Sequence, residues 1–417
     1  MKHRSLGIII LLILQFVLLT VISLGIFPQY QSWHGFDLQH YHRISLYLQQ
    51  GLIPYRDFLL EYPPLALIPI LLPQLLSPQV PLDGVDYAVG FVMVNLILTS
   101  LMGLGMALIP HPRPQQTLLG YLLLTVLLAP LLPWRYDLFP TLLTLGGLLG
   151  IIFNFPLLAG VALGLGIATK LYPVVLLPIW GLYFAVSRDW RGLGKLSLGA
   201  IVSTLLSCLP FWLLAGESFT SFLTYHKDRG LQIESLWAGL ISLGHVLGLT
   251  EASSEMNFGA QHIVSPLAAP LLTLQPVIFV GMMLLIYGLA ALVFRQEIRQ
   301  SESIKLQSLV VFSLLSLLGF IVTNKVFSPQ YLIWLLPFVP LLRWPAVTVV
   351  GVSFALTTTV SFVTRQLRLM YPPSVLMLNF RNLLLFGLVL SLLFSFYKKL
   401  SETPKKMSAS HLANHTE

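Results

Sequence analysis

Charged residues are scarce in this sequence. Only 10% of its 417 positions are Asp, Glu, Lys or Arg, whereas 56% are hydrophobic, and the mean hydropathy is +0.82. Because soluble domains carry about 25% charged residues, the chain has too little polar surface to cover a globule in water. The composition excludes a soluble enzyme. The net charge of +8 is therefore interpreted as membrane topology, and no nucleic-acid partner is expected.

Cysteine and the usual ligand motifs are also nearly absent. Cys208 is the single cysteine and lies in an apolar run, which rules out an intrachain disulfide and a cysteine-based zinc site. His40 and His42 are two positions apart and do not share a helix face, and no His-Glu-x-x-His element or glycine-rich phosphate loop occurs. The sequence therefore predicts no metal site and no cofactor, although a role for a divalent cation stays open. Without a nucleotide site, a membrane-borne substrate is favoured.

Long apolar runs are abundant instead. A run of about 20 apolar residues crosses a hydrocarbon core about 30 Å thick and must be helical there. The predicted fold is an all-α polytopic transmembrane bundle of about 12 spans, three of which are short. The predicted spans are 6–26, 86–108, 117–133, 138–154, 156–169, 171–186, 195–214, 267–294, 306–323, 328–343, 345–364 and 379–397. The first is interpreted as a retained span, since it is too long for a signal peptide.

The basic residues follow a single topology. With the N-terminus in the cytoplasm, the inside segments hold 14 of the 24 basic residues and five of the 16 acidic ones, so the net charge is +9 inside and −1 outside. This bias agrees with the positive-inside rule. The sequence predicts a multi-pass protein of the cell (plasma or inner) membrane with both termini cytoplasmic. Residues 1–397 form one membrane domain, and 398–417 form a short, disordered cytoplasmic tail.

Two extracytoplasmic segments are longer than turns: 27–85 and 215–266. In the first, five residues repeat with helical spacing while polar residues occupy the other faces. They are Leu38, Tyr41, Ile44, Ser45 and Leu48. The pattern predicts amphipathic helices at the membrane interface, and the proline-rich apolar stretch 64–76 is expected to lie at the interface or re-enter.

Cations also occur on the predicted outer side, against the topological bias. The candidates for holding a donor phosphate are Arg135, Lys170, Lys227, Arg229 and Lys325. Lys and Arg form charge-assisted hydrogen bonds with phosphate oxygens, which favours a lipid-linked phosphate as the ligand. For Lys170 and Lys325 the alternative is that each simply extends to the outer headgroups.

Asp37 is the leading candidate for a general base. It follows the first span by about ten residues, precedes the amphipathic stretch and has no cation adjacent in sequence. A carboxylate at the headgroup level can accept the proton of an attacking hydroxyl. Its alternative role is the N-cap of the following helix.

Four further acids are candidates for catalysis or acceptor binding: Asp57, Glu61, Asp137 and Glu234. Local ion pairs compete with such roles. Arg56 is next to Asp57 and close to Glu61, and Arg135 is two residues from Asp137.

The motifs of the outer segments resemble those of a known group. They are Asp37 and Tyr41; Gly51, Pro54 and Tyr55; Glu61-Tyr62-Pro63-Pro64; Lys170, Tyr172 and Pro173; and Asn324 to Tyr331. Their order and shared side resemble integral membrane glycosyltransferases of the GT-C type, most of all the bacterial polyprenol-phosphate-mannose-dependent mannosyltransferases. The resemblance extends from the first span to about residue 345.

This resemblance implies transfer of a sugar from a polyprenyl-phosphate carrier, with inversion, on the extracytoplasmic face. Asp37 corresponds to the acidic residue of the first outer loop. Substrate-lining roles are implied for Tyr41, Tyr55, Tyr62, Tyr172, Gln330 and Tyr331. No large soluble domain follows the last span, so a lipid or glycan acceptor is expected rather than a protein.

Three other classes stay open: a transporter or flippase of lipid-linked sugars, a carrier-lipid polymerase or ligase, and a membrane scaffold. A transporter usually has two similar halves and broken helices near the midplane. Here the polar residues gather at the outer rim, which favours the glycosyltransferase.

Overall fold

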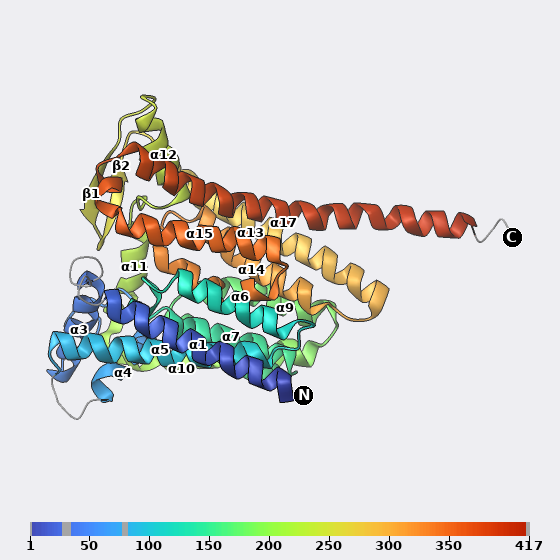
Figure 1. The fold of residues 1–417 in the computed structure, drawn as a ribbon, viewed down its shortest axis with the longest axis horizontal. Helices are drawn as coiled ribbons and strands as arrows, with labels where there is room; N and C mark the ends of the chain where they lie inside the picture. Colours follow the sequence, from blue (N-terminus) through green and yellow to red (C-terminus); the bar gives the residue numbers. More distant parts are fainter. Residues whose placement is uncertain (1, 27–34, 77–81, 414–417) are drawn as a thin grey trace.

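The computed structural model describes residues 2–26, 35–76 and 82–413 and shows a bundle of helices (Figure 1). Seven helical segments are long and apolar enough to cross a membrane. They are α1 (Lys2–Ile26), α5 (Gly84–Leu108), α10 (Trp190–Ala215) continued through η5 (Gly216–Thr220) and α11 (Ser221–Asp228), α13 (Ala268–Ser301), α14 (Leu306–Thr323), α15 (Trp344–Phe362) and α17 (Pro372–Ala413). The prediction of an all-α polytopic membrane protein agrees with this architecture.

Shorter helices fill the rest of the bundle. They are α3 (Gly35–Gln49), η2 (Pro64–Ala66), α4 (Leu67–Leu75), α6 (Pro114–Leu127), η3 (Leu132–Trp134), α7 (Leu138–Ile152), α8 (Pro156–Thr169), η4 (Tyr172–Leu176), α9 (Leu177–Val186), α12 (Leu236–Val246), η6 (Pro329–Leu335), η7 (Val339–Leu341) and α16 (Thr364–Arg368). The predicted count of about 12 spans is not confirmed. Segment 328–343 in particular is not one helix, because prolines divide it into the short 3₁₀ turns η6 and η7.

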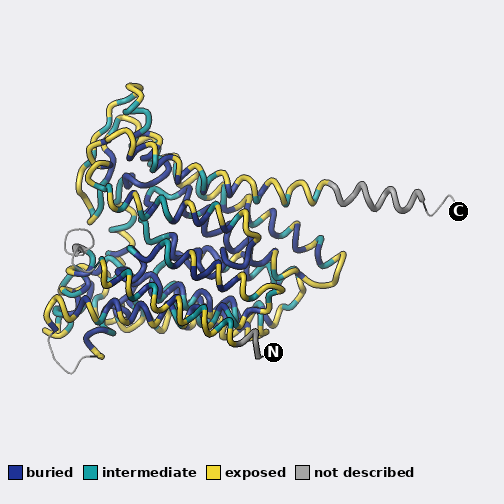
Figure 2. The backbone as a smooth tube through the Cα atoms, viewed as in Figure 1, coloured by how far each residue is buried: buried dark blue, intermediate teal, exposed yellow. Residues whose placement is uncertain are grey.

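Burial follows the bundle geometry. Dark, buried segments lie inside the bundle, and exposed residues lie along its outer helices (Figure 2). Helix α14 is buried over most of its length, whereas α1 and α10 expose leucines and isoleucines. Large exposed apolar surfaces of this kind suit contact with lipid.

The two long segments that the sequence predicts to be extracytoplasmic fold at the same end of the bundle. Helices α3 and α4 lie there with α11, α12 and a hairpin of β1 (Ser253–Asn257) and β2 (Ala260–Val264), while the start of α1 lies at the other end (Figure 1). The hairpin is absent from the sequence prediction. Residues 27–34 and 77–81 of the predicted first loop are outside the described residues.

Helix α3 confirms the amphipathic pattern. Leu38, Tyr41, Ile44 and Ser45 are at most 2% exposed. Their face packs with residues of α4 and α5 in one apolar cluster rather than on lipid alone. Helix α17 extends from Pro372 to Ala413 and so includes residues 398–413 of the predicted tail.

Candidate functional site

A cavity of about 640 Å³ opens at the end of the bundle that carries α3, α11 and the β-hairpin. Twelve of the sequence-predicted site residues line it, although they come from distant parts of the chain. They are Asp37, Glu61, Tyr62, Arg135, Lys170, Tyr172, Lys227, Arg229, Glu234, Lys325, Gln330 and Tyr331. Most lie just before or after helices, where the chain leaves the apolar interior and polar side chains are tolerated.

Asp37 lies in the first turn of α3 and forms an ion pair with Arg135, which follows η3. The carboxylate is 33% exposed, whereas the guanidinium is only 10% exposed. The sequence shows no cation adjacent to Asp37, and its partner comes instead from a distant part of the chain. The pair fixes the carboxylate on the cavity wall and leaves part of it accessible.

Asp137 has a different partner from the one expected. Lys170 Nζ lies 2.7 Å from its Oδ1, and the indole N–H of Trp334 donates to the same oxygen at 2.7 Å. Asp137 is fully buried and does not line the cavity. The predicted pairing with Arg135 is corrected. Burial lowers the pKa of Lys170 and the Asp137 charge opposes this effect.

Aromatic rings surround the Lys170 ammonium. Its Nζ lies 4.7 Å from the ring centroid of Tyr136. Tyr172 and Tyr331 both stack on the ring of Trp334, with centroids 4.1 and 4.0 Å away. Such faces attract cations and pack against the apolar faces of other rings. The stack forms a rigid aromatic wall of the cavity.

Two predicted lining tyrosines do not reach the cavity. Tyr41 is buried beneath it, and burial and the Asp37 charge raise its pKa well above the ordinary value. Tyr55 packs on Phe219 and donates its hydroxyl to the carbonyl of Tyr62 at 2.7 Å. Both therefore support the lining rather than form it.

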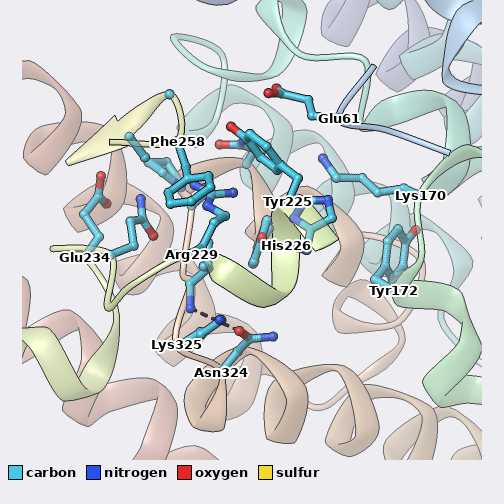
Figure 3. A pocket seen from close by; sticks show the side chains of 18 of the residues that line it. Glu61, Lys170, Tyr172, Tyr225, His226, Arg229, Glu234, Phe258, Asn324 and Lys325 are labelled. Carbon is cyan, nitrogen blue, oxygen red and sulfur yellow. Dashed lines mark hydrogen bonds between the residues drawn. The ribbon is translucent and has the colours of Figure 1, made fainter. Parts of the chain in front are cut away.

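A group of cations also lines the cavity, and two of them, Arg229 and Lys325, lie apart from Lys170 and Tyr172 in Figure 3. It consists of Lys227, Arg229, Lys325 and Arg368, none of which pairs with an acid within the described part of the chain. Lys325 Nζ donates to the carbonyl of Lys227 at 2.6 Å. Burial and the nearby Arg229 guanidinium lower the pKa of Lys325. The Asp228 charge opposes this lowering. A concentration of cations without ion pairs, in the part of the chain that is described, is suited to an anion.

The remaining acids occupy different positions. Glu234 lines the cavity but its carboxylate accepts from Arg381 Nη1 at 3.0 Å, and burial raises its pKa while the Arg381 charge opposes the rise. Glu61 lines the cavity, and its Oε1 lies 3.7 Å from Nε2 of His40. Asp57 lies outside it and pairs with its neighbour Arg56 at 2.9 Å, so the structure does not bring Asp57 to the other candidates.

Sequence reasoning missed several residues of the site. Trp334 lies in an apolar stretch that carried no sequence signal, whereas Gln232 lies between the predicted residues Arg229 and Glu234 but was not itself predicted. Tyr225 and His226 adjoin the predicted cations and line the cavity between Lys170 and Arg229 in the view of Figure 3. Arg381 did have a signal, because an arginine inside an apolar run is a candidate for function.

The bundle and its cavity define a multi-pass membrane protein with a polar, cation-lined cavity at one end. Comparison with protein families gives a match to glycosyltransferase family 87 over residues 58–323. The chain belongs to this family, and it is a membrane glycosyltransferase. A search of curated proteins found no match. The matched segment contains Glu61, Arg135, Lys170 and Arg229, whereas Lys325 lies beyond it.

Proposed function

We propose that this enzyme transfers a hexose from a polyprenyl-phosphate carrier to a lipid or glycan acceptor, with inversion, on the extracytoplasmic face of the membrane. The resemblance noted from the motifs favours mannose. The observation that carries the proposal is that a partly exposed carboxylate and a group of cations without ion pairs among the described residues line one cavity. Family membership does not favour the transporter alternative.

In the proposed reaction, the carboxylate and the cations of the cavity have different roles. Asp37 accepts the proton of the acceptor hydroxyl while its oxygen attacks the anomeric carbon. The bond between that carbon and the phosphate oxygen breaks, and polyprenyl phosphate leaves with the additional negative charge. Arg229 and Lys325 stabilise this charge. Anion binding also relieves the repulsion between the two cations, because it places negative charge between them.

Arg229→Gln and Lys325→Gln are each expected to raise the KM for a polyprenyl-phosphate sugar about tenfold or more. A hydrogen bond to a charged group contributes about 1.5–3 kcal/mol, and removal of either cation loses one such contact. The measurement is initial-rate kinetics of purified protein with labelled polyprenyl-phosphate mannose. Arg43→Gln is the matched control, because Arg43 is exposed on α3 and does not line the cavity. If both variants kept the wild-type KM, the phosphate would have to bind elsewhere.

The proposed sidedness predicts a labelling pattern. In a Cys208→Ser background, Asp57→Cys should react with a membrane-impermeant thiol reagent in intact cells, because Asp57 lies on an accessible turn at the cavity end. Arg191→Cys, in α10 at the opposite end, should react only after lysis. The reverse pattern would place the cavity in the cytoplasm and exclude the proposed topology.

A further inference from the structure

Arg381 lies inside the last long helix, α17, and is fully buried. It occupies the part of α17 that is apolar enough to span a membrane. An arginine at this depth is costly unless it is paired and hydrogen-bonded. The contacts of the Arg381 side chain therefore indicate its role.

The guanidinium holds one wall segment of the cavity directly. Nη1 donates to Glu234 Oε2 at 3.0 Å, and Nη2 donates to the backbone carbonyl of Glu234 at 2.7 Å. Asn382 orients the guanidinium by accepting from Nε at 3.1 Å, and its own amide donates to the carbonyl of Glu234 at 3.3 Å. A forked contact to side chain and backbone fixes position more strictly than a single charge does.

The same guanidinium also contacts a second wall segment. Its central carbon lies 4.1 Å from the ring centroid of Phe327, a cation–π contact. Phe327 follows Lys325 by two residues, and Glu234 follows Arg229 by five. Arg381 thus contacts both segments, 229–235 and 324–328, that carry the main cations of the cavity.

These two segments are joined to each other by two hydrogen bonds, one between backbone groups and one from the backbone to a side chain. The N–H of Gln232 donates to the carbonyl of Lys325 at 3.0 Å, and the N–H of Phe327 donates to Gln232 Oε1 at 2.7 Å. Both segments are otherwise loops, whose positions depend on such contacts. A shift of Glu234 or Phe327 is consequently transmitted to Arg229 and Lys325.

We infer that Arg381 is a positioning residue, which sets the spacing of Arg229 and Lys325 for the donor phosphate without contacting the donor itself. This inference rests on the proposed phosphate role of the two cations. It assigns α17, outside the family-matched segment 58–323, a part in donor binding. It also makes Glu234 the counter-ion of Arg381 rather than a catalytic acid.

Arg381→Gln should raise the KM for the polyprenyl-phosphate sugar about tenfold. Its kcat should change less than about threefold, because the substitution leaves the proposed general base Asp37 unchanged. Amides of 231–235 and 324–328 should exchange with deuterium faster. Arg381→Lys keeps the charge but not the fork and should give a smaller effect in the same direction. If Arg381→Gln does not fold, the same measurements on Arg381→Lys test the inference.

Two comparisons separate positioning from other causes. Glu297→Gln is the matched control, since Glu297 is a buried acid that contacts Lys399 of the same helix α17 away from the cavity. It should lower the melting temperature without changing the donor KM. The double variant Arg381→Gln/Glu234→Gln removes both charges, and its KM should stay raised. A KM restored by the double variant would mean that Arg381 only neutralises Glu234, which overturns the inference.

Failure of the inference differs from failure of the proposed function. If Arg229→Gln and Lys325→Gln raise the donor KM but Arg381→Gln changes neither KM nor amide exchange, the positioning role is wrong. If Arg229→Gln and Lys325→Gln have no effect on donor KM, the phosphate site itself is wrong. Faster exchange in Arg381→Gln would then still show that it holds the two segments, and its role in donor binding would be overturned.

Discussion

Asp37→Asn is expected to slow sugar transfer at least about a hundredfold while donor binding stays near that of the wild type. Loss of a general base typically costs 10²–10⁴-fold in rate. The asparagine keeps the shape of the side chain and can still accept a hydrogen bond from Arg135. The substitution therefore mainly removes the basicity of the side chain. The measurement is kcat with saturating labelled donor, together with donor affinity from a binding assay in detergent micelles.

Two other acids serve as comparisons for Asp37. Asp57→Asn should leave transfer unchanged, because Asp57 pairs with Arg56 outside the cavity. Glu61 lines the cavity beside His40, and Glu61→Gln should affect acceptor KM more than kcat. If Glu61→Gln abolished transfer and Asp37→Asn did not, the base would be Glu61. A similar melting temperature for all three variants shows that the comparison concerns chemistry rather than folding.

The local part of the structure was predictable from local patterns. The spacing of Leu38, Tyr41 and Ile44 predicts one buried face of a helix, and α3 has that face. Apolar runs likewise predicted the long helices α5, α13 and α14. These features depend on neighbours three or four residues away, so the sequence alone is sufficient.

Pairings between distant residues were not predictable in the same way. Asp37 pairs with Arg135, and Asp137 with Lys170, although Arg135 and Asp137 are two residues apart. The backbone is extended at Arg135 but already helical at Asp137, the residue before α7, so the two side chains reach different partners. Only the packing of α3, η3 and α8 decides between the alternatives.

The predicted number of spans is not confirmed, for a related reason. Hydropathy measures how apolar a run is, but residues buried inside a protein and residues facing lipid are equally apolar. Prolines in 328–343 produce short 3₁₀ turns that are buried in the bundle, and hydropathy alone gives the same signal as for a span.

Asp137→Asn is expected to lower the free energy of unfolding by about 3–5 kcal/mol, the usual cost of removing one partner of a buried ion pair. Lys170 is left with 16% of its side chain exposed and no carboxylate within reach, while Trp334 keeps an oxygen acceptor. Lys170→Met/Asp137→Asn should recover most of this loss, because no buried charge is left unpaired. The measurement is a double-mutant cycle from reversible unfolding in mixed micelles, and the coupling energy isolates the pair from the effect of each substitution.

A wild-type unfolding midpoint for Asp137→Asn would show that the Lys170 ammonium is compensated from the cavity side. In that case Lys170 would be free to join Arg229 and Lys325 at the donor phosphate, instead of serving Asp137 as its counter-ion.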